Sequence, residues 1–317
     1  MARPLRITYP GAFYHITSRG NERKAIFKSR RDREKFLEYL ESAVLRYDAV
    51  IHTYCLMDNH YHLLLETPSG NLSQIMHHIN GSYTTYFNVK RKRAGHLFQG
   101  RYQSILVDID EYANELSRYI HLNPVRAKMA ELPESYEWSS YPCFIGKNKA
   151  PKWLHRNFIL AYFGKKISIA EKRYKAFVEA LLNQKYESPL TGVVSSTLLG
   201  ASDFIERIRD KYLSGMQSDK DVPATKELLQ KVTLDQIFTA VDAVFEDEPV
   251  VARNVKMYLC QKYSGKSLKE ISSHFGISDS GVSHSRRRAA ERIQKDQKTR
   301  KRVGRIESEL NLSRFKT

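Results

Sequence analysis

Cysteine and long apolar runs are both scarce in this sequence, and each shortage excludes a class of protein. The three cysteines, Cys55, Cys143 and Cys260, are odd in number and widely spaced, which excludes a disulfide framework and a zinc site built from CxxC motifs. No stretch approaches the ~18 apolar residues of a membrane span, and residues 1–13 lack the apolar segment of a signal peptide. We therefore expect a soluble, cytoplasmic protein.

Acidic residues are few relative to basic ones. The chain has 35 Asp or Glu against 52 Lys or Arg, which gives a formal charge of +17 and an isoelectric point near 9.6. Such an excess predicts a polyanionic partner, and the aromatic residues among the basic ones favour nucleic acid over an anionic membrane surface. The alternative is a basic soluble protein that binds no polyanion. Residues 250–317 alone hold 17 basic and 6 acidic residues, so the charge is concentrated there and a nucleoid location is expected.

Hydrophobic patterning predicts a sheet with helices in the first half of the chain. Four stretches rich in β-branched and aromatic residues predict strands: 7–20, 50–57, 60–66 and 101–108. Apolar residues at helical spacing predict a helix after the capping signature at 29–32, a long helix after Asn71, and a helix that Asp110 caps and Pro124 ends. The order predicts an α+β fold with a mostly antiparallel sheet.

Length and composition divide the chain further. At 317 residues, two or three units are expected, since domains usually hold ~100–200 residues. We predict the α+β domain at 1–150, a helical middle region with a linker at 151–249, and a basic all-α domain at 250–317. The polar stretch at 214–225 is the expected linker.

The stretch MDNHYHLLLE, residues 57–66, places two histidines one residue apart. Strand side chains alternate between faces, so His60 and His62 share one face and Tyr61 points to the other. The backbone positions of His60 and His62 on one strand are ~7 Å apart, which lets both imidazoles reach one metal ion. A His-x-His pair alone is more often two half-exposed histidines, so the pair leaves both interpretations open.

A second cluster lies in RYIHLNPVRA, residues 118–127. Tyr119 and Asn123 are four residues apart on the expected helix and therefore lie on the same face. An amide oxygen there could complete a metal site beside a phenol. The alternative is that Tyr119 belongs to the core and Asn123 only ends the helix.

Residues 267–293 have the pattern of a helix-turn-helix. Apolar residues space a first helix, Gly276 marks the turn, and Ser278 is placed to cap a second helix. On that second helix the outward positions are polar or basic and are expected to face DNA: Ser280, Ser283, His284, Arg286 and Arg287. The alternative is a basic helical pair that contacts proteins or has general affinity for DNA.

Four motifs, together and in this order, resemble the REP-associated tyrosine transposases, relatives of the single-tyrosine insertion-sequence transposases of the HUH nuclease class. They are NHYHLLLE at 59–66, GHLFQGRYQSILVD at 95–108, YIHLNPVRA at 119–127 and WSSY at 138–141. The resemblance implies an HUH-type, ferredoxin-like domain at 1–150. The tail at 250–317 resembles the DNA-binding domain of the DnaA replication initiators, but departs from it at SDSGVSHS, residues 278–285.

The resemblance also implies roles for individual residues. His60, His62 and Asn123 would bind Mg²⁺ or Mn²⁺, and Tyr119 would attack single-stranded DNA to form a 5′-phosphotyrosine. The substrate would be a repeated palindrome folded as a hairpin, and the outcome strand transfer. Apart from the resemblance, the basic loop offers Arg19, Asn21 and Arg23 as candidates to contact DNA near the cleavage point, with a solvated basic turn as the alternative. Arg126 is a candidate phosphate contact or a surface residue. Ser280, His284, Arg286 and Arg287 are expected to contact duplex DNA.

Two other functions are compatible with the same residues. A rolling-circle replication initiator uses the same histidine and tyrosine chemistry, and a DNA-binding regulator could retain the fold without catalysis. The oligomeric state is left open by the sequence, with a monomer slightly favoured.

Overall fold

The computed structural model describes residues 6–182, 184, 188–194, 196–212, 233–264, 266 and 268–310. These residues form two compact units. The first extends to Val193 and includes Thr197–Gly200, and the second holds the described residues from Ala201 onward together with Val194 and Ser196. This division differs from the expected limits at 150 and 250. The linker expected at 214–225 lies outside the described residues.

The first unit is built on a five-stranded sheet in the order β2-β3-β1-β4-β5. Its strands are β1 (Ala12–Arg19), β2 (Val50–Leu56), β3 (His60–Thr67), β4 (Gln103–Val107) and β5 (Leu198–Leu199). The first four pair antiparallel, as predicted, and follow the split βαβ order of ferredoxin-like folds. β5 pairs parallel with β4, so the sheet is mixed. The predicted α+β class is confirmed, with this one correction.

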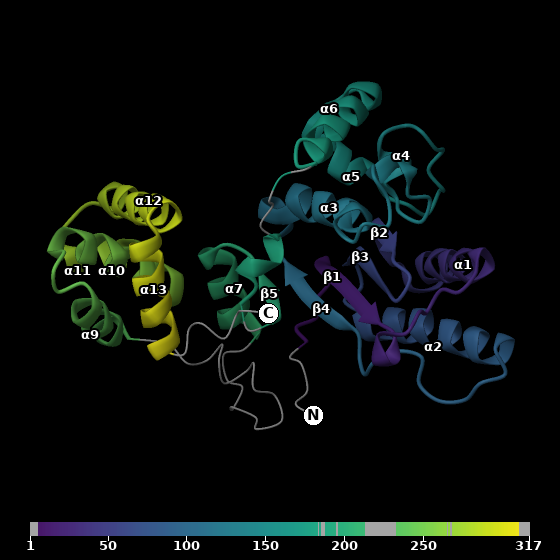
Figure 1. The fold of residues 1–317 in the computed structure, drawn as a ribbon, viewed down its shortest axis with the longest axis horizontal. Helices are drawn as coiled ribbons and strands as arrows, with labels where there is room; N and C mark the ends of the chain where they lie inside the picture. The colour runs from purple at the N-terminus through teal and green to yellow at the C-terminus, as the bar shows by residue number, and fades with distance from the viewer. Residues whose placement is uncertain are drawn as a thin grey trace. The chain divides into compact units, whose positions relative to one another are not determined.

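Helices cover both faces of the sheet (Figure 1). α1 (Arg30–Tyr47) and α2 (Leu72–Lys90) lie on one face and α3 (Ile109–Arg126) on the other. Tyr61 of β3 points toward α1 and α2, since its ring packs on Phe36 and its hydroxyl donates to Asn80. His62, the next residue, contacts Tyr119 of α3. The alternation predicted for this strand is therefore confirmed.

α3 begins and ends at other residues than the sequence predicts. Asp108 is its N-cap, so Asp110 lies in the first turn, and Pro124 lies inside the last turn. A proline removes only its own N–H, and the helix closes beyond it because the Ala127 N–H donates to the Asn123 carbonyl. The helix thus carries Asn123 within a regular turn.

Shorter helices complete the first unit, and several of them pack on α3. They are η1 (Asn21–Arg23), η2 (Pro133–Ser135), α4 (Tyr141–Phe144), α5 (Asn157–Leu160), η3 (Ala161–Phe163), α6 (Ile167–Glu179) and η4 (Pro189–Gly192). Tyr174 and Val178 of α6 share one hydrophobic core with Leu116 and Ile120 of α3. Residues beyond 150 therefore belong to this unit because they bury the outer face of α3.

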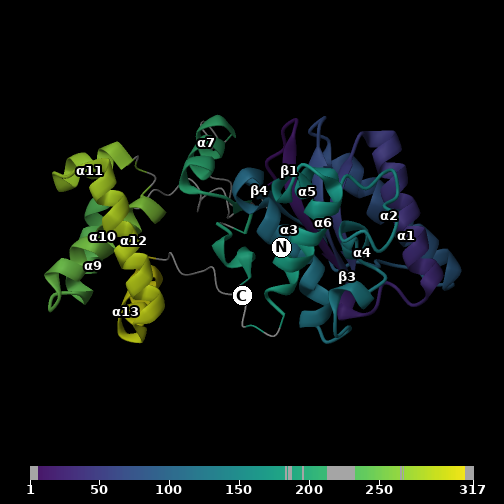
Figure 2. The ribbon, with the colours of Figure 1, turned by 90° about the horizontal axis from the view of Figure 1, so that it is seen from above.

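The described residues of the second unit are mainly helical. Its helices are α7 (Ser202–Tyr212), α9 (Leu234–Val244), α10 (Pro249–Tyr263), α11 (Leu268–Phe275), α12 (Asp279–Lys295) and α13 (Gln297–Glu309). α9 to α13 surround one core with Val255, Ile271 and Val282 at full burial, and Figure 2 shows these five helices gathered together. Among the described residues, no helix is long and apolar enough to cross a membrane.

Candidate functional site

His60 and His62 stand at the start of β3, on the face that α3 covers. Their ring centroids are 5.0 Å apart and the rings meet edge to face. His62 is buried and His60 is half-buried. The parity of the strand therefore places both imidazoles together, as predicted, at one end of the sheet.

β1 adds side chains to the same face. In the antiparallel register Arg19 pairs with His60 and Thr17 pairs with His62, and directly paired residues share a face. The Thr17 hydroxyl also donates to Oε1 of Gln103 on β4, at 3.3 Å. Arg19, predicted to contact DNA, is exposed and thus stands across from the half-buried histidine.

His15 of β1 is a third histidine at this site. Its Nε2 lies 3.0 Å from Nδ1 of His62, and the two rings are parallel to within 5°. His15 is buried, 1% exposed. The strand register brings it one diagonal step from His62, since His15 pairs with Leu64.

Tyr119 comes from α3 and faces this histidine pair. Its ring lies edge to face with His15 and His62, at centroid distances of 6.0 Å and 5.9 Å. The tyrosine is half-buried. The predicted nucleophile and the predicted metal ligand are therefore in direct contact.

Asn123 and Arg126 follow Tyr119 on α3. Asn123 donates from Nδ2 to the Tyr119 carbonyl, at 2.9 Å, which leaves its Oδ1 as the oxygen that could bind a metal. The Arg126 guanidinium lies 5.1 Å from the centroid of the Tyr119 ring and is exposed. The neighbouring Arg118 instead packs on Phe177 of α6, 3.9 Å from the ring centroid.

The three histidines are neutral at physiological pH. Burial lowers the pKa of His15 to about 3, and burial together with the charge of Arg19 lowers the pKa of His60 to about 4. Burial and the neighbouring His15 hold the pKa of His62 well below its usual range. A neutral imidazole is the form that binds metal ions.

The donor set fits a divalent cation. Nε2 of His62 is buried and has no hydrogen-bond partner, as expected of a nitrogen reserved for a ligand. The described residues hold no group of three or more His, Cys, Asp or Glu suited to a metal. The residues that could hold a cation are His60, His62 and the Asn123 amide, with water or phosphate completing its coordination.

The basic loop after β1 lies next to the histidines. Asn21 and Arg23 are exposed, and Glu22 and Arg23 adopt left-handed backbone angles, φ of 54° and 58°. The loop is fixed by the Asn21 N–H, which donates to the Leu97 carbonyl, and by Asn59, whose Nδ2 donates to the Arg23 carbonyl. A cavity of about 290 Å³ adjoins it, lined by Asn21, Glu22, Lys24, Ala25, Lys28, Arg93 and Leu97.

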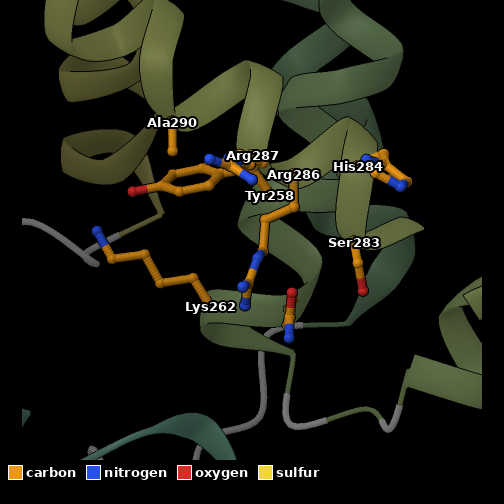
Figure 3. A pocket seen from close by; sticks show the side chains of 8 residues that line it. Tyr258, Lys262, Ser283, His284, Arg286, Arg287 and Ala290 are labelled. Atoms are coloured by element: carbon orange, nitrogen blue, oxygen red, sulfur yellow. The ribbon is translucent and has the colours of Figure 1, made fainter. Parts of the chain in front are cut away.

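The second unit carries a separate basic groove. The α11–α12 pair is joined by a short turn in which Gly276 has a φ of +63° and Ser278 caps α12 by accepting from the Gly281 N–H. A groove of about 510 Å³ lies between α10 and α12 (Figure 3). Its lining residues are Tyr258, Gln261, Lys262, Ser283, His284, Arg286, Arg287 and Ala290. Ser280 is exposed near the start of α12 and is not in this lining.

Two residues of the candidate sites were not identified from the sequence. His15 contacts His62 across two strands, and Asn59 contacts both His60 and the basic loop. His15 stands between Tyr14 and Ile16 in β1, and a histidine between two such residues is the signal that the sequence offers. Its partner depends on strand register, which is a long-range property.

Comparison with known proteins gives one family. Residues 8–123 match the model of the family described as "Transposase IS200 like". A solved structure described as "Structure of the REP associates tyrosine transposase bound to a REP hairpin" aligns with 14% identity and a TM-score of 0.41, over 48% of this chain and 89% of that chain. No curated protein matches the chain. The family match includes His60, His62, Tyr119 and Asn123.

Proposed function

We propose that this protein is a metal-dependent endonuclease and strand transferase of single-stranded DNA, acting on palindromic hairpins through a 5′-phosphotyrosine. The observation that carries the proposal is the contact of Tyr119 with the His15–His62 pair, beside His60, within a segment matching IS200-like transposases. A phenol beside two neutral imidazoles and an amide that could bind a divalent cation is a set suited to phosphodiester transfer to tyrosine.

The chain's own residues have distinct roles in the transfer. Tyr119 attacks the phosphorus, a bond forms between Tyr119 Oη and phosphorus, and the bond from phosphorus to the 3′ oxygen breaks. The phenolic proton is released and the leaving 3′ oxygen takes up a proton, so the products are a 5′-phosphotyrosine and a free 3′ hydroxyl. Attack by a 3′ hydroxyl reverses these steps and joins strands without an external energy source.

The remaining groups hold the phosphate in place. His60, His62 and Asn123 would hold the divalent cation, which supplies stabilisation of the negative charge on the phosphoryl oxygens when bound. Arg126 beside the Tyr119 ring stabilises the phenolate as it forms. Arg19 stands opposite His60 and is placed to contact the neighbouring phosphate.

The basic loop would bind the strand next to the scissile phosphate. Asn21 and Arg23 are exposed on a loop with a fixed backbone, and the adjoining cavity is lined by two lysines and Arg93. A fixed backbone with cations and an amide side chain suits recognition of an unpaired nucleotide.

The direct test uses hairpin oligonucleotides from repeats near the protein's own gene, with Mn²⁺ or Mg²⁺. On a denaturing gel, a 3′-labelled oligonucleotide should be retained on the protein, whereas a 5′-labelled one should give a short fragment that a polymerase can extend. Tyr119→Phe and a chelator should both abolish the adduct. The matched control, Tyr112→Phe, removes a phenol two turns earlier on α3 and should leave it intact.

Other outcomes identify other functions. Hairpin binding without an adduct on any repeat would indicate a DNA-binding regulator and overturn the proposal. If a supercoiled plasmid is nicked and replicated and no strand transfer is seen, the topology of the products would indicate a rolling-circle initiator.

We further propose that the second unit binds duplex DNA through α12. His284, Arg286 and Arg287 are exposed on the second helix of a helix-turn-helix, beside the aromatic ring of Tyr258. Each phosphate contact contributes ~0.9 to the dependence of log affinity on log salt. Arg286→Ala should therefore lower the magnitude of this salt slope by ~1.

Arg302→Ala is the matched control for this experiment. Arg302 already forms ion pairs with Asp247 and Glu248, at 2.7 Å and 3.2 Å, so its removal should leave the slope unchanged. Equal slopes for Arg286→Ala and the parent protein, measured by fluorescence anisotropy, would exclude Arg286 as a phosphate contact.

A further inference from the structure

Both metal-binding histidines have a hydrogen-bond partner at Nδ1. Nδ1 of His60 lies 2.7 Å from Oδ1 of Asn59, and Nδ1 of His62 lies 3.0 Å from Nε2 of His15. A neutral imidazole carries one proton, so a proton on Nδ1 leaves the lone pair on Nε2. The partners at Nδ1 therefore decide which nitrogen each histidine offers to a cation.

Asn59 determines the proton position of His60. Nδ2 of Asn59 donates to the Arg23 carbonyl at 3.0 Å, and a carbonyl can only accept. The amide is thereby oriented with Oδ1 toward His60, and an amide oxygen also can only accept. The proton of His60 must then lie on Nδ1, and Nε2 holds the lone pair.

His15 can play the same part for His62, because Nε2 of His15 can accept the proton of Nδ1 of His62. If His62 carries the proton on Nδ1, it donates to His15 and keeps a lone pair on its buried Nε2. If His15 donates instead, His62 has its proton on Nε2. Nδ1 of His15 and Nε2 of His62 are both buried without a partner, so each arrangement leaves one buried N–H without an acceptor, and burial alone does not choose between them. A cation on Nε2 of His62 is compatible with the first arrangement alone.

We propose that Asn59 and His15 are positioning residues that hold His60 and His62 in the tautomer with the Nε2 lone pair toward a shared divalent cation. The inference rests on the proposed function, since it assumes that this cation is bound. It assigns roles to two side chains that approach from different elements: Asn59 from the turn before β3, and His15 from the middle of β1.

The test measures Mn²⁺ affinity in the absence of DNA, from the electron paramagnetic resonance signal of free Mn²⁺. Loss of such a partner typically weakens metal binding 10–100-fold. Asn59→Ala and His15→Phe should each weaken Mn²⁺ binding by about this factor. His15→Phe keeps a ring of similar shape and removes the acceptor nitrogen.

A conservative variant separates positioning from packing. His15→Gln places an amide oxygen near the position of Nε2 and should recover most of the affinity, because that oxygen can accept from Nδ1 of His62. Asn88→Ala is the matched control for Asn59: Asn88 Nδ2 also donates to a carbonyl, that of Gly95, at 2.9 Å, and this variant should bind Mn²⁺ as the parent protein does.

The outcomes distinguish this inference from the proposed function. If the parent protein binds no Mn²⁺, or if His62→Ala leaves its Mn²⁺ binding unchanged, the metal site itself is overturned. If His62→Ala abolishes binding while Asn59→Ala and His15→Phe retain full affinity, the positioning roles are overturned and the site stands. Equal losses in His15→Gln and His15→Phe would also overturn the role of His15, since packing alone would then explain them.

Discussion

Among single residues, His121 of α3 is a buried histidine with a hydrogen-bond partner at each ring nitrogen. It is fully buried, and burial lowers its pKa to about 3, so its ring is neutral. Nδ1 lies 2.7 Å from the Tyr174 hydroxyl and Nε2 lies 2.7 Å from the Ser140 hydroxyl, while Tyr174 donates to Ser117 at 3.0 Å. A side chain on α3 is thus tied to α6 and to the residue before α4.

Tyr174→Phe should destabilise the first unit without changing its fold. The substitution leaves a nitrogen of His121 buried without a partner, which costs about 1–3 kcal/mol of unfolding free energy. Urea denaturation followed by fluorescence would measure the loss. Tyr162→Phe, at a side chain 46% exposed, should change the free energy of unfolding by less than about 0.5 kcal/mol; an equal loss in both variants would contradict the role of the network.

The site could be predicted from the sequence where it depends on local geometry, and not where it depends on register. His60 and His62 share a face because strand side chains alternate, and Asn123 follows Tyr119 by one helical turn. That Tyr119 meets His62 rested on family resemblance, since spacing along the chain does not fix a contact between α3 and β3. His15 was missed because the pairing of β1 with β3 decides its neighbour.

Between elements, Asp32 links the start of α1 to the end of α2. Its carboxylate is fully buried and lies 2.6 Å from Nζ of Lys90 and 2.5 Å from a guanidinium nitrogen of Arg91. Burial opposes its ionisation, but hydrogen bonds from Lys90, the Lys28 N–H, Ser29 and Arg91 outweigh burial and lower the pKa of Asp32 to about 2. The ion pairs therefore hold two helices that lie on the same face of the sheet.

This carboxylate should make stability depend on pH in the acid range. Because the folded pKa lies below the unfolded value near 3.8, the stabilisation is complete above about pH 5 and is lost as pH falls through 3.8 toward 2. The contribution amounts to about 2 kcal/mol. Asp32→Asn should be less stable at pH 6 and should lose less stability than the parent protein between pH 5 and 3, measured by urea denaturation; identical pH slopes would contradict this assignment.

The elements themselves were predictable to the extent that each has its own periodicity. The four antiparallel strands, the long helix α2 and the order of elements follow from alternation and helical spacing. β5 could not be predicted, because two residues have no periodicity and Leu198–Leu199 form a strand only beside β4. Pro124 suggested a helix end, but it lies inside the last turn of α3, where the loss of one N–H donor is tolerated.

For the molecule as a whole, the decisive feature among the described residues is that each unit has a hydrophobic core that shares no residue with the core of the other unit. One includes residues of α3, α4 and α6, such as Leu116, Phe144 and Tyr174, and the other includes Ile237, Val255 and Val303. Cores formed by separate sets of residues can unfold independently, so a single two-state transition is not expected.

Calorimetry should therefore resolve two unfolding transitions, and Mn²⁺ should raise the midpoint temperature of only one of them. At 100 times its dissociation constant, a ligand of the folded state stabilises by about 2.7 kcal/mol, which raises the midpoint of a unit of this size by about 5–10 °C. The other transition should stay in place, and His62→Ala should abolish the shift. A single unfolding transition, or a rise in the midpoint temperatures of both transitions, would show that the units do not unfold separately.

Asn59 would link the two proposed binding events, which are those of a nucleotide and of a cation. Its side chain holds the Arg23 carbonyl of the basic loop and Nδ1 of His60, and its carbonyl accepts from the Gly20 N–H. A nucleotide bound to this loop would therefore be coupled to the imidazole through Asn59. By thermodynamic reciprocity, a bound cation would then tighten nucleotide binding by the same factor as the nucleotide tightens cation binding. The protein would then be a heterotropic switch, in which strand and cation each recruit the other before any bond is cut.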